Sequence, residues 1–172
     1  TRAIAGTVPQ LDDRPVYGGT PSDASVMQSI AALHAAGNEV MFYPFILMDQ
    51  LAGNGRSDPY SGAADQPELP WRGRITLSRA PGTSGSPDGT AEAAAEVAAF
   101  FGTAQPEHFT IVPGGVSYSG PLEHSLRRFI LHYAALCKAA GGGEAFCIGS
   151  EMRGLTQIRG PGDSFPAVAQ FV

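Results

Sequence analysis

The chain has 172 residues, of which 43% are hydrophobic and 16% are charged. This composition supplies enough apolar side chains for a buried core and excludes a globally disordered chain. The 11 Lys plus Arg residues stand against 16 Asp plus Glu, which gives a net charge of -5 without any basic stripe. We therefore expect no nucleic-acid partner, because phosphate contacts dominate that kind of binding. The most apolar stretch, residues 40–48, is far shorter than the roughly 20 residues that cross a bilayer, so we expect no membrane span.

The side chains that usually bind metals show no metal-ligand pattern. Cys137 and Cys147, the only cysteines, lie ten positions apart, which fits neither a zinc site nor a disulfide framework, so both are predicted to be buried thiols. The histidines also lack a metal spacing and are predicted to be structural or solvated: His34, His108, His124 and His132. We expect neither a metal nor a cofactor.

The first half of the chain predicts an irregular arm, one helix and one strand. Residues 1–21 are rich in Pro, Gly, Asp and Thr and show no sustained period. Apolar residues then recur at helical spacing, with Thr20 or Ser22 as the cap and Gly37 at the end. Residues 39–48 follow as a strand covered on both faces, although Pro44 inside this run counts against a central position in a sheet.

The second half alternates helices and short apolar runs after a long loop. Residues 49–88 carry many turn signals, and a loop of this length inside a compact domain is predicted to be functional. The sequence then predicts helices and strands in alternation, namely a helix over 90–101, a strand over 109–113, a helix over 121–140, a strand over 144–150 and a helix that begins near Phe165.

This alternation predicts an α/β fold with a parallel sheet. A doubly wound nucleotide-binding fold is disfavoured, because Gly53-Asn54-Gly55 lacks the final glycine of its fingerprint and no phosphate-binding loop occurs. A (β/α)₈ barrel needs about 250 residues, so the chain would supply about half of a single TIM-barrel domain. The start at Thr1, without an initiator methionine or a signal-peptide pattern, suggests an excerpt, and we expect the flanking barrel strands outside the chain.

The residues that follow the predicted strands are the first candidates for a site, because α/β folds place their sites at the carboxyl ends of strands. Asp49 and Glu151 supply carboxylates there, and glycoside hydrolysis uses a pair of carboxylates. Two interpretations stay open for Glu151, namely a catalytic group that follows a tight turn at Ser150, or a residue that opens a loop and pairs with Arg153. For Asp49 a role as a helix or turn cap is favoured.

The long loop contributes Tyr60, Trp71 and Arg72, and sugar rings commonly bind on aromatic faces with charged groups at the rim. Aromatic residues in loops also serve as hydrophobic plugs, and for Trp71 the plug is the favoured alternative. Tyr118 follows a glycine pair at a strand end, where it could face the same cleft or pack on the third helix. No G-x-S-x-G motif occurs, so a hydrolase triad has no anchor.

The chain contains several long and unusual segments, namely YGGTPSD at 17–23, FYPFILMD at 42–49, WRGRI at 71–75, GSPDGT at 85–90, SLRRFILHY at 125–133 and FCIGSEMRGL at 146–155. These segments resemble the TIM-barrel-like domain of the large tail (baseplate) protein of gene transfer agents and related phages. The resemblance implies a glycoside hydrolase-like, host-specificity domain in the tail of a phage-like particle, assembled in the bacterial cytoplasm. Its implied partners are envelope polysaccharide or peptidoglycan and other tail subunits.

The resemblance also assigns roles to single residues. The strand before Glu151 would be the fourth of the barrel, where retaining glycosidases carry an Asn-Glu pair whose Glu is the acid/base. Glu151 matches this Glu, whereas Ser150 stands in place of the substrate-binding Asn, and the nucleophile would lie outside the chain. Two functions remain, a retaining glycosidase-like enzyme or a non-catalytic tail scaffold or carbohydrate-binding module. For the enzyme we expect Glu151 to lie in one depression with Asp49 and at least one of Tyr60, Trp71 and Tyr118, partly shielded from water.

Overall fold

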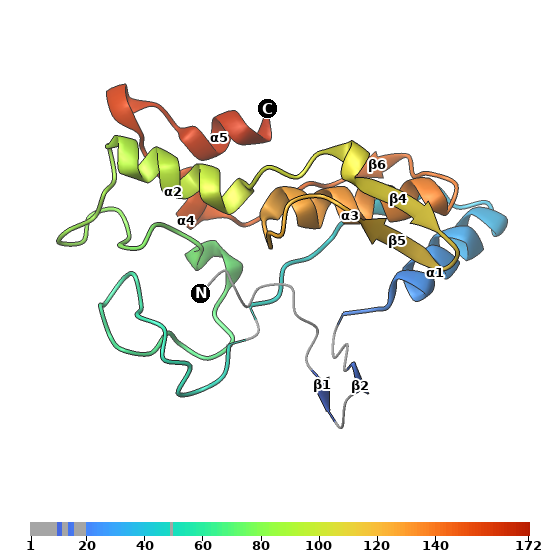
Figure 1. The fold of residues 1–172 in the computed structure, drawn as a ribbon, viewed down its shortest axis with the longest axis horizontal. Helices are drawn as coiled ribbons and strands as arrows, with labels where there is room; N and C mark the ends of the chain where they lie inside the picture. The colour runs from blue at the N-terminus through green and yellow to red at the C-terminus, as the bar shows by residue number, and fades with distance from the viewer. Residues whose placement is uncertain (1–9, 12–13, 16–19, 49) are drawn as a thin grey trace. The chain divides into compact units, whose positions relative to one another are not determined.

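The structure is a computed structural model that describes residues 10–11, 14–15, 20–48 and 50–172. The chain divides into two compact units, and it passes between them three times (Figure 1). Unit 1 comprises Thr1–Pro44 and Gly102–Ile148, and unit 2 comprises Phe45–Phe101 and Gly149–Val172. The predicted arm contains one short antiparallel pair, β1 (Gln10–Leu11) with β2 (Arg14–Pro15), where only irregular chain was expected.

Unit 1 is built on two helices that start at predicted or nearby caps. Helix α1 (Asp23–Ala35) begins after Ser22, whose hydroxyl accepts a hydrogen bond from the Ser25 amide at 3.3 Å. Helix α3 (Leu126–Ala139) begins after Ser125, five residues later than predicted, because the Ser125 hydroxyl caps the Arg128 amide at 3.1 Å. The short η3 helix (Pro106–His108) precedes the next strand. The apolar faces enclose a core of Val26, Ile30, Val40, Leu136 and Cys137.

Two of the predicted strands pair in parallel, as expected. Strand β3 (Met41–Phe42) lies beside β6 (Ala145–Phe146), with Met41 opposite Ala145. Both strands are much shorter than the predicted 39–48 and 144–150. Pro44 explains the early end of β3, because proline has no N–H to donate to a ladder.

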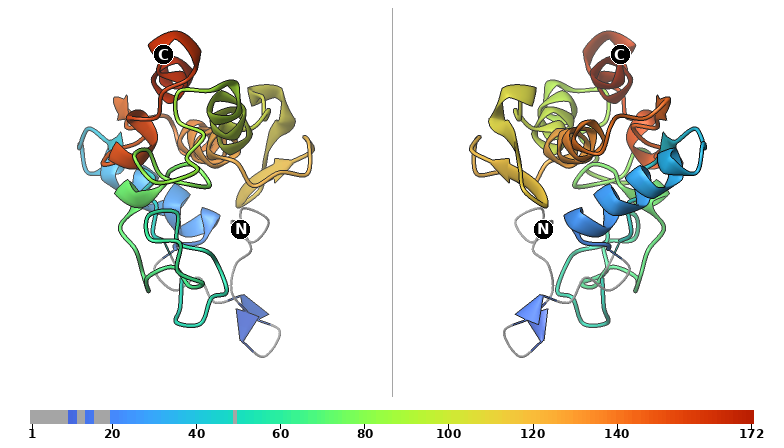
Figure 2. Two further views of the ribbon diagram at one scale, coloured as in Figure 1. Left: turned by 90° about the vertical axis from the view of Figure 1, so that its left-hand side faces the viewer. Right: turned by 90° about the vertical axis from the view of Figure 1, so that its right-hand side faces the viewer.

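The prediction that 109–113 continues this parallel sheet is wrong. Strand β4 (Phe109–Val112) instead pairs antiparallel with β5 (Gly115–Tyr118), and the two strands run side by side in both views of Figure 2. The reason is the Pro113-Gly114 turn, in which Gly114 has φ 77°. Proline followed by glycine at positive φ closes a two-residue turn, so the chain reverses instead of crossing over.

Unit 2 combines three helices with a long irregular segment. Helix α2 (Ala91–Phe101) agrees with its prediction, α5 (Pro166–Phe171) starts one residue after the expected Phe165, and α4 (Arg153–Thr156) was not predicted. The rings of Phe101 and Phe171 meet edge to face, 5.0 Å apart. The core of the unit consists of Leu77, Ala80, Ala93, Val97, Phe101, Met152, Leu155, Ile158 and Ala167.

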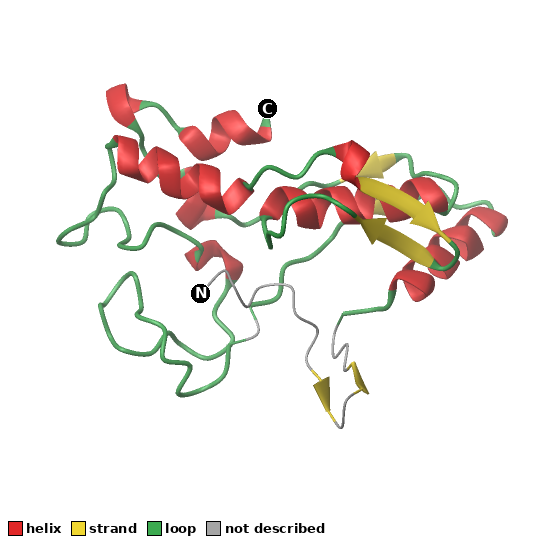
Figure 3. Cartoon of the chain, in the orientation of Figure 1, coloured by secondary structure: helices red, strands yellow, loops and turns green. Residues whose placement is uncertain are grey.

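The predicted long loop has no α-helix or strand among its described residues, 50–88 (Figure 3). Its regular structure is the η2 helix (Arg72–Arg74), and the further η4 helix (Pro161–Asp163) lies near the end of the chain. The described residues form a mixed α/β fold with three two-stranded sheets. Within this described part, none of the helices has the length and apolarity needed to span a bilayer.

Candidate functional site

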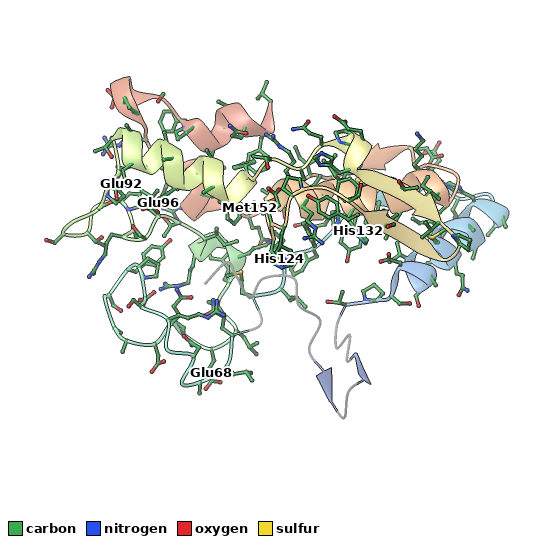
Figure 4. All side chains as sticks on the ribbon, viewed as in Figure 1. Glu68, Glu92, Glu96, His124, His132 and Met152 are labelled. Carbon is green, nitrogen blue, oxygen red and sulfur yellow. The ribbon has the colours of Figure 1, made fainter. Side chains whose placement is uncertain are left out.

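Glu151 lies in unit 2, in the short connection before α4, and has an unusual backbone conformation. Its φ is 55°, and non-glycine residues rarely adopt positive φ. Met152, which follows it, is buried and is labelled in Figure 4. The Glu151 side chain itself is 56% exposed, so the expectation that it is shielded from water is wrong. The left-handed turn at residue 151 separates this outward carboxylate from the buried residue that follows it.

Two residues of the long loop converge on the Glu151 carboxylate. The indole N–H of Trp71 donates to Glu151 Oε2 at 2.7 Å, and Nη2 of Arg72 lies 3.1 Å from the same oxygen. Trp71 precedes the η2 helix and Arg72 begins it, so the local fold presents both side chains to one partner. Trp71 remains 50% exposed, which favours the platform over the plug.

The Arg72 side chain is buried and contacts other residues of unit 2. Its side chain is only 6% exposed, and its guanidinium lies 3.8 Å from the centre of the Phe45 ring. Nε donates to the Ser150 carbonyl at 3.1 Å, and Nη2 is 3.3 Å from the Ser150 hydroxyl. These bonds fix residues 150 and 151 together, so Arg72 positions the predicted site residues and does not itself face a ligand.

Gly154 allows α4 to approach the η2 helix closely, and Gly73 makes room for the Trp71 ring. A Cβ on Gly154 would lie 2.6 Å from the Gly73 carbonyl and 2.8 Å from the Tyr60 hydroxyl. A Cβ on Gly73 would lie 2.4 Å from the Trp71 ring, which folds back over that residue. The sequences WRGR and SEMRG therefore pack against each other through these glycines.

Tyr60 belongs to a neighbouring charged cluster in the same unit. The Arg74 guanidinium lies 4.3 Å from the centre of the Tyr60 ring and donates to Asp58 Oδ1 at 2.8 Å. Burial alone would raise the pKa of Asp58, but hydrogen bonds from Ser61 and Arg74 outweigh it and hold this pKa below its usual value. Burial raises the pKa of Tyr60 above its usual value. This cluster anchors the loop behind the Trp71–Glu151 pair.

The other predicted site residues lie elsewhere. Asp49 falls outside the described residues. Tyr118 belongs to unit 1, where its hydroxyl donates to the Pro121 carbonyl at 3.0 Å and the Arg128 guanidinium lies 4.1 Å from the centre of its ring. Arg128 is part of α3, so the contacts of Tyr118 are those of the packing alternative.

Two of the histidines make structural contacts within unit 1. His132 Nε2 lies 3.0 Å from Asp23 Oδ1, and His108 Nδ1 accepts a hydrogen bond from the Gln105 amide at 3.1 Å. Among residues 20–48 and 50–172, no group of three or more His, Cys, Asp or Glu side chains could hold a metal ion.

Sequence reasoning missed Phe45, Asp58, Gly73 and Gly154 as parts of the site. Phe45 sits in an apolar run that was interpreted as a strand, and Asp58 sits in a loop with many polar residues. The pairing of two R-G steps, Arg72-Gly73 and Arg153-Gly154, was the one signal in the sequence. Each glycine follows an arginine at a point where two backbones meet.

Comparison with known proteins identifies the C-terminal part of the chain. Residues 124–172 match the family model described as the GTA TIM-barrel-like domain. This segment contains α3, Ser150 and Glu151, whereas Trp71 and Arg72 lie before it. Comparison with curated proteins gives no significant match. This match confirms the resemblance to the gene transfer agent TIM-barrel-like domain for residues 124–172.

Proposed function

We propose that the chain engages glycan of the bacterial envelope through the Trp71–Glu151 pair, as part of the tail of a gene transfer agent or related particle. The observation that carries the proposal is the half-exposed indole ring whose N–H is held by a carboxylate. The ring offers an apolar face to the C–H groups of a sugar. The carboxylate offers an acceptor to its hydroxyl groups.

The rigidity of the pair supports binding. Arg72 fixes Glu151 from behind, and Gly73 lets the Trp71 ring lie against the backbone. A side chain that is already held in its bound orientation loses less conformational entropy when a ligand arrives. We further propose that both units belong to one TIM-barrel-like domain, about half of which lies in this chain, because the chain passes between the units three times.

Retaining glycoside hydrolysis at Glu151 is the second candidate. The positive φ of Glu151 favours it, because strained backbone is concentrated at functional sites. Such hydrolysis needs a second carboxylate about 5 Å from the first. This partner would be Asp49 or a residue outside the chain. Against this candidate stand the exposure of Glu151 and the serine at position 150 in place of asparagine.

Cosedimentation of the complete protein with purified envelope glycan tests the binding function. Trp71→Ala removes the platform and should weaken binding about fivefold, since stacking on one aromatic ring contributes about 1 kcal/mol. Trp71→Phe keeps an apolar ring but loses the N–H, so its affinity for glycan should lie between those of the parent and Trp71→Ala. Leu69→Ala, which alters another exposed apolar residue of the same loop, should bind like the parent.

The same preparations distinguish binding from hydrolysis. Release of reducing sugar ends by the parent, abolished in Glu151→Gln, would establish the enzyme. Binding without release would establish a carbohydrate-binding module. If neither the parent nor the variants bind glycan, the barrel is a tail scaffold and the proposal fails.

A further inference from the structure

The ion pair between Arg72 and Glu151 has a buried end and an exposed end. The arginine side chain is 6% exposed and the glutamate side chain 56%. Glu151 uses Oε2 for both Trp71 and Arg72, and its Oε1 receives no hydrogen bond from any residue that the structure describes. The polar atom that this cluster presents to solvent is therefore an acceptor with negative charge.

We infer that the site selects neutral or cationic sugars and disfavours sugars that carry a carboxylate. The inference rests on the proposed function, because it assigns a charge class to the glycan bound there. A hydroxyl or an ammonium group can donate to Glu151 Oε1. A sugar carboxylate has no proton to donate and is repelled by the same oxygen.

Arg72 cannot reverse this preference. Proteins usually bind carboxylates through the nitrogen fork of an arginine. The Arg72 fork is already directed at Ser150 and Glu151, and its face lies on Phe45. The charge of the exposed Arg153 lowers the pKa of Tyr60 and so opposes the effect of burial there.

The expected discrimination is modest and depends on salt. Two like charges about 4 Å apart in water repel by an energy that corresponds to about a fivefold change in affinity. The Arg72 charge behind the carboxylate reduces this effect, so we expect about threefold at low salt. At 1 M salt the screening length is about 3 Å, and the difference should nearly vanish.

Isothermal titration calorimetry of the complete protein with four trisaccharides tests the inference. Cellotriose and fully N-acetylated chitotriose are neutral, the glucosamine trimer is cationic, and cellotriose oxidised to carboxylates at C6 is anionic. For the parent we expect the neutral and cationic trimers to bind and the C6-carboxylate trimer to bind about threefold more weakly than cellotriose.

Two matched variants locate the source of the discrimination. In Glu151→Gln the amide oxygen can accept from Trp71 and Arg72 while its NH₂ turns outward, so the preference against the carboxylate should disappear or reverse. Glu92→Gln removes the same net charge from an exposed position on α2 (Figure 4) and should keep the preference of the parent.

Each outcome decides a separate claim. If the C6-carboxylate trimer binds the parent as tightly as cellotriose, the charge selection is wrong while glycan binding stands. If Glu151→Gln keeps the discrimination of the parent, Glu151 is not its source and the inference is overturned. If none of the four trimers binds at millimolar concentration, the proposed function fails as well.

Discussion

The helical core of unit 1 and the long loop of unit 2 are held together by different forces. In unit 1, α1 and α3 enclose aliphatic side chains such as Ile30 and Leu136. In unit 2, charged side chains hold residues 50–88, with Asp58 bound to Arg74 and Asp88 bound to Arg159 at 2.7 Å. The first region should therefore respond to lost volume, and the second to lost charge or to steric change at close backbone contacts.

A cavity in the unit 1 core should have the largest effect. Leu136 is fully buried, so Leu136→Ala should lower the free energy of unfolding by about 3 kcal/mol. Leu122→Ala is the matched control, because Leu122 is 96% exposed in the same unit. Urea denaturation measures both, and hydrogen exchange should show the loss in α1 and α3. A loss below about 1 kcal/mol for Leu136→Ala would show that this core does not hold the unit together.

Removal of a buried charge should have the next largest effect. Asp58→Asn leaves Arg74 without its anion and weakens the bonds from Ser61, which should lower the unfolding free energy by about 2 kcal/mol. Glu68→Gln changes an exposed carboxylate of the same loop (Figure 4) and should have no measurable effect. Equal effects of the two variants would contradict the view that buried charges anchor the loop.

A single methyl group should disturb the contact between η2 and α4. Gly154→Ala places a Cβ 2.6 Å from the Gly73 carbonyl, so we expect a loss of about 1.5 kcal/mol in unfolding free energy and weaker glycan binding. In Gly149→Ala the nearest atom is the Met152 sulfur at 3.5 Å, which is ordinary contact, and this control should be milder. Wild-type stability and binding in Gly154→Ala would mean that the two segments are not in close contact.

Acid should weaken a polar anchor within unit 1. Burial tends to raise the pKa of Glu123, but hydrogen bonds from Ser125, Thr103 and Ala104 lower it from 4.5 to about 2. A lowered folded-state pKa contributes stability above pH 4.5, and this contribution is lost as the pH falls toward 2. We expect about 1 kcal/mol from this half-buried carboxylate, measured as the difference between the parent and Glu123→Gln. Parallel pH profiles of the two proteins would contradict the assignment.

The sequence predicted the elements that local chemistry determines. Helices α1 and α2 have caps, apolar periodicity and a terminal glycine, all within a few residues of one another. The β4–β5 hairpin was missed because Pro113-Gly114 was interpreted only as the end of a strand. The direction in which a chain continues after a turn depends on the geometry of the turn. A Pro-Gly sequence indicates a turn but does not determine that geometry.

The candidate site was predictable as a set of residue types but not as a set of contacts. The sequence offers Trp71, Arg72, Ser150 and Glu151 as candidate site residues, each with a structural alternative or a departure from the family pattern beside it. The bond from Arg72 to Ser150 joins residues 78 positions apart. No periodicity in the sequence connects positions so far apart. The positioning role of Arg72 could therefore be recognised only from its contacts in the structure.

Trp71 fluorescence tests the central claim most directly, because Trp71 is the only tryptophan in the chain. The difference in emission between the complete parent protein and Trp71→Phe isolates its signal. On titration with chitotriose, the account predicts a saturable change in this difference spectrum, which Glu151→Gln alters and Glu92→Gln leaves as in the parent. A difference spectrum that stays constant while the protein binds glycan would contradict the account, because the sugar would then bind away from the Trp71–Glu151 pair.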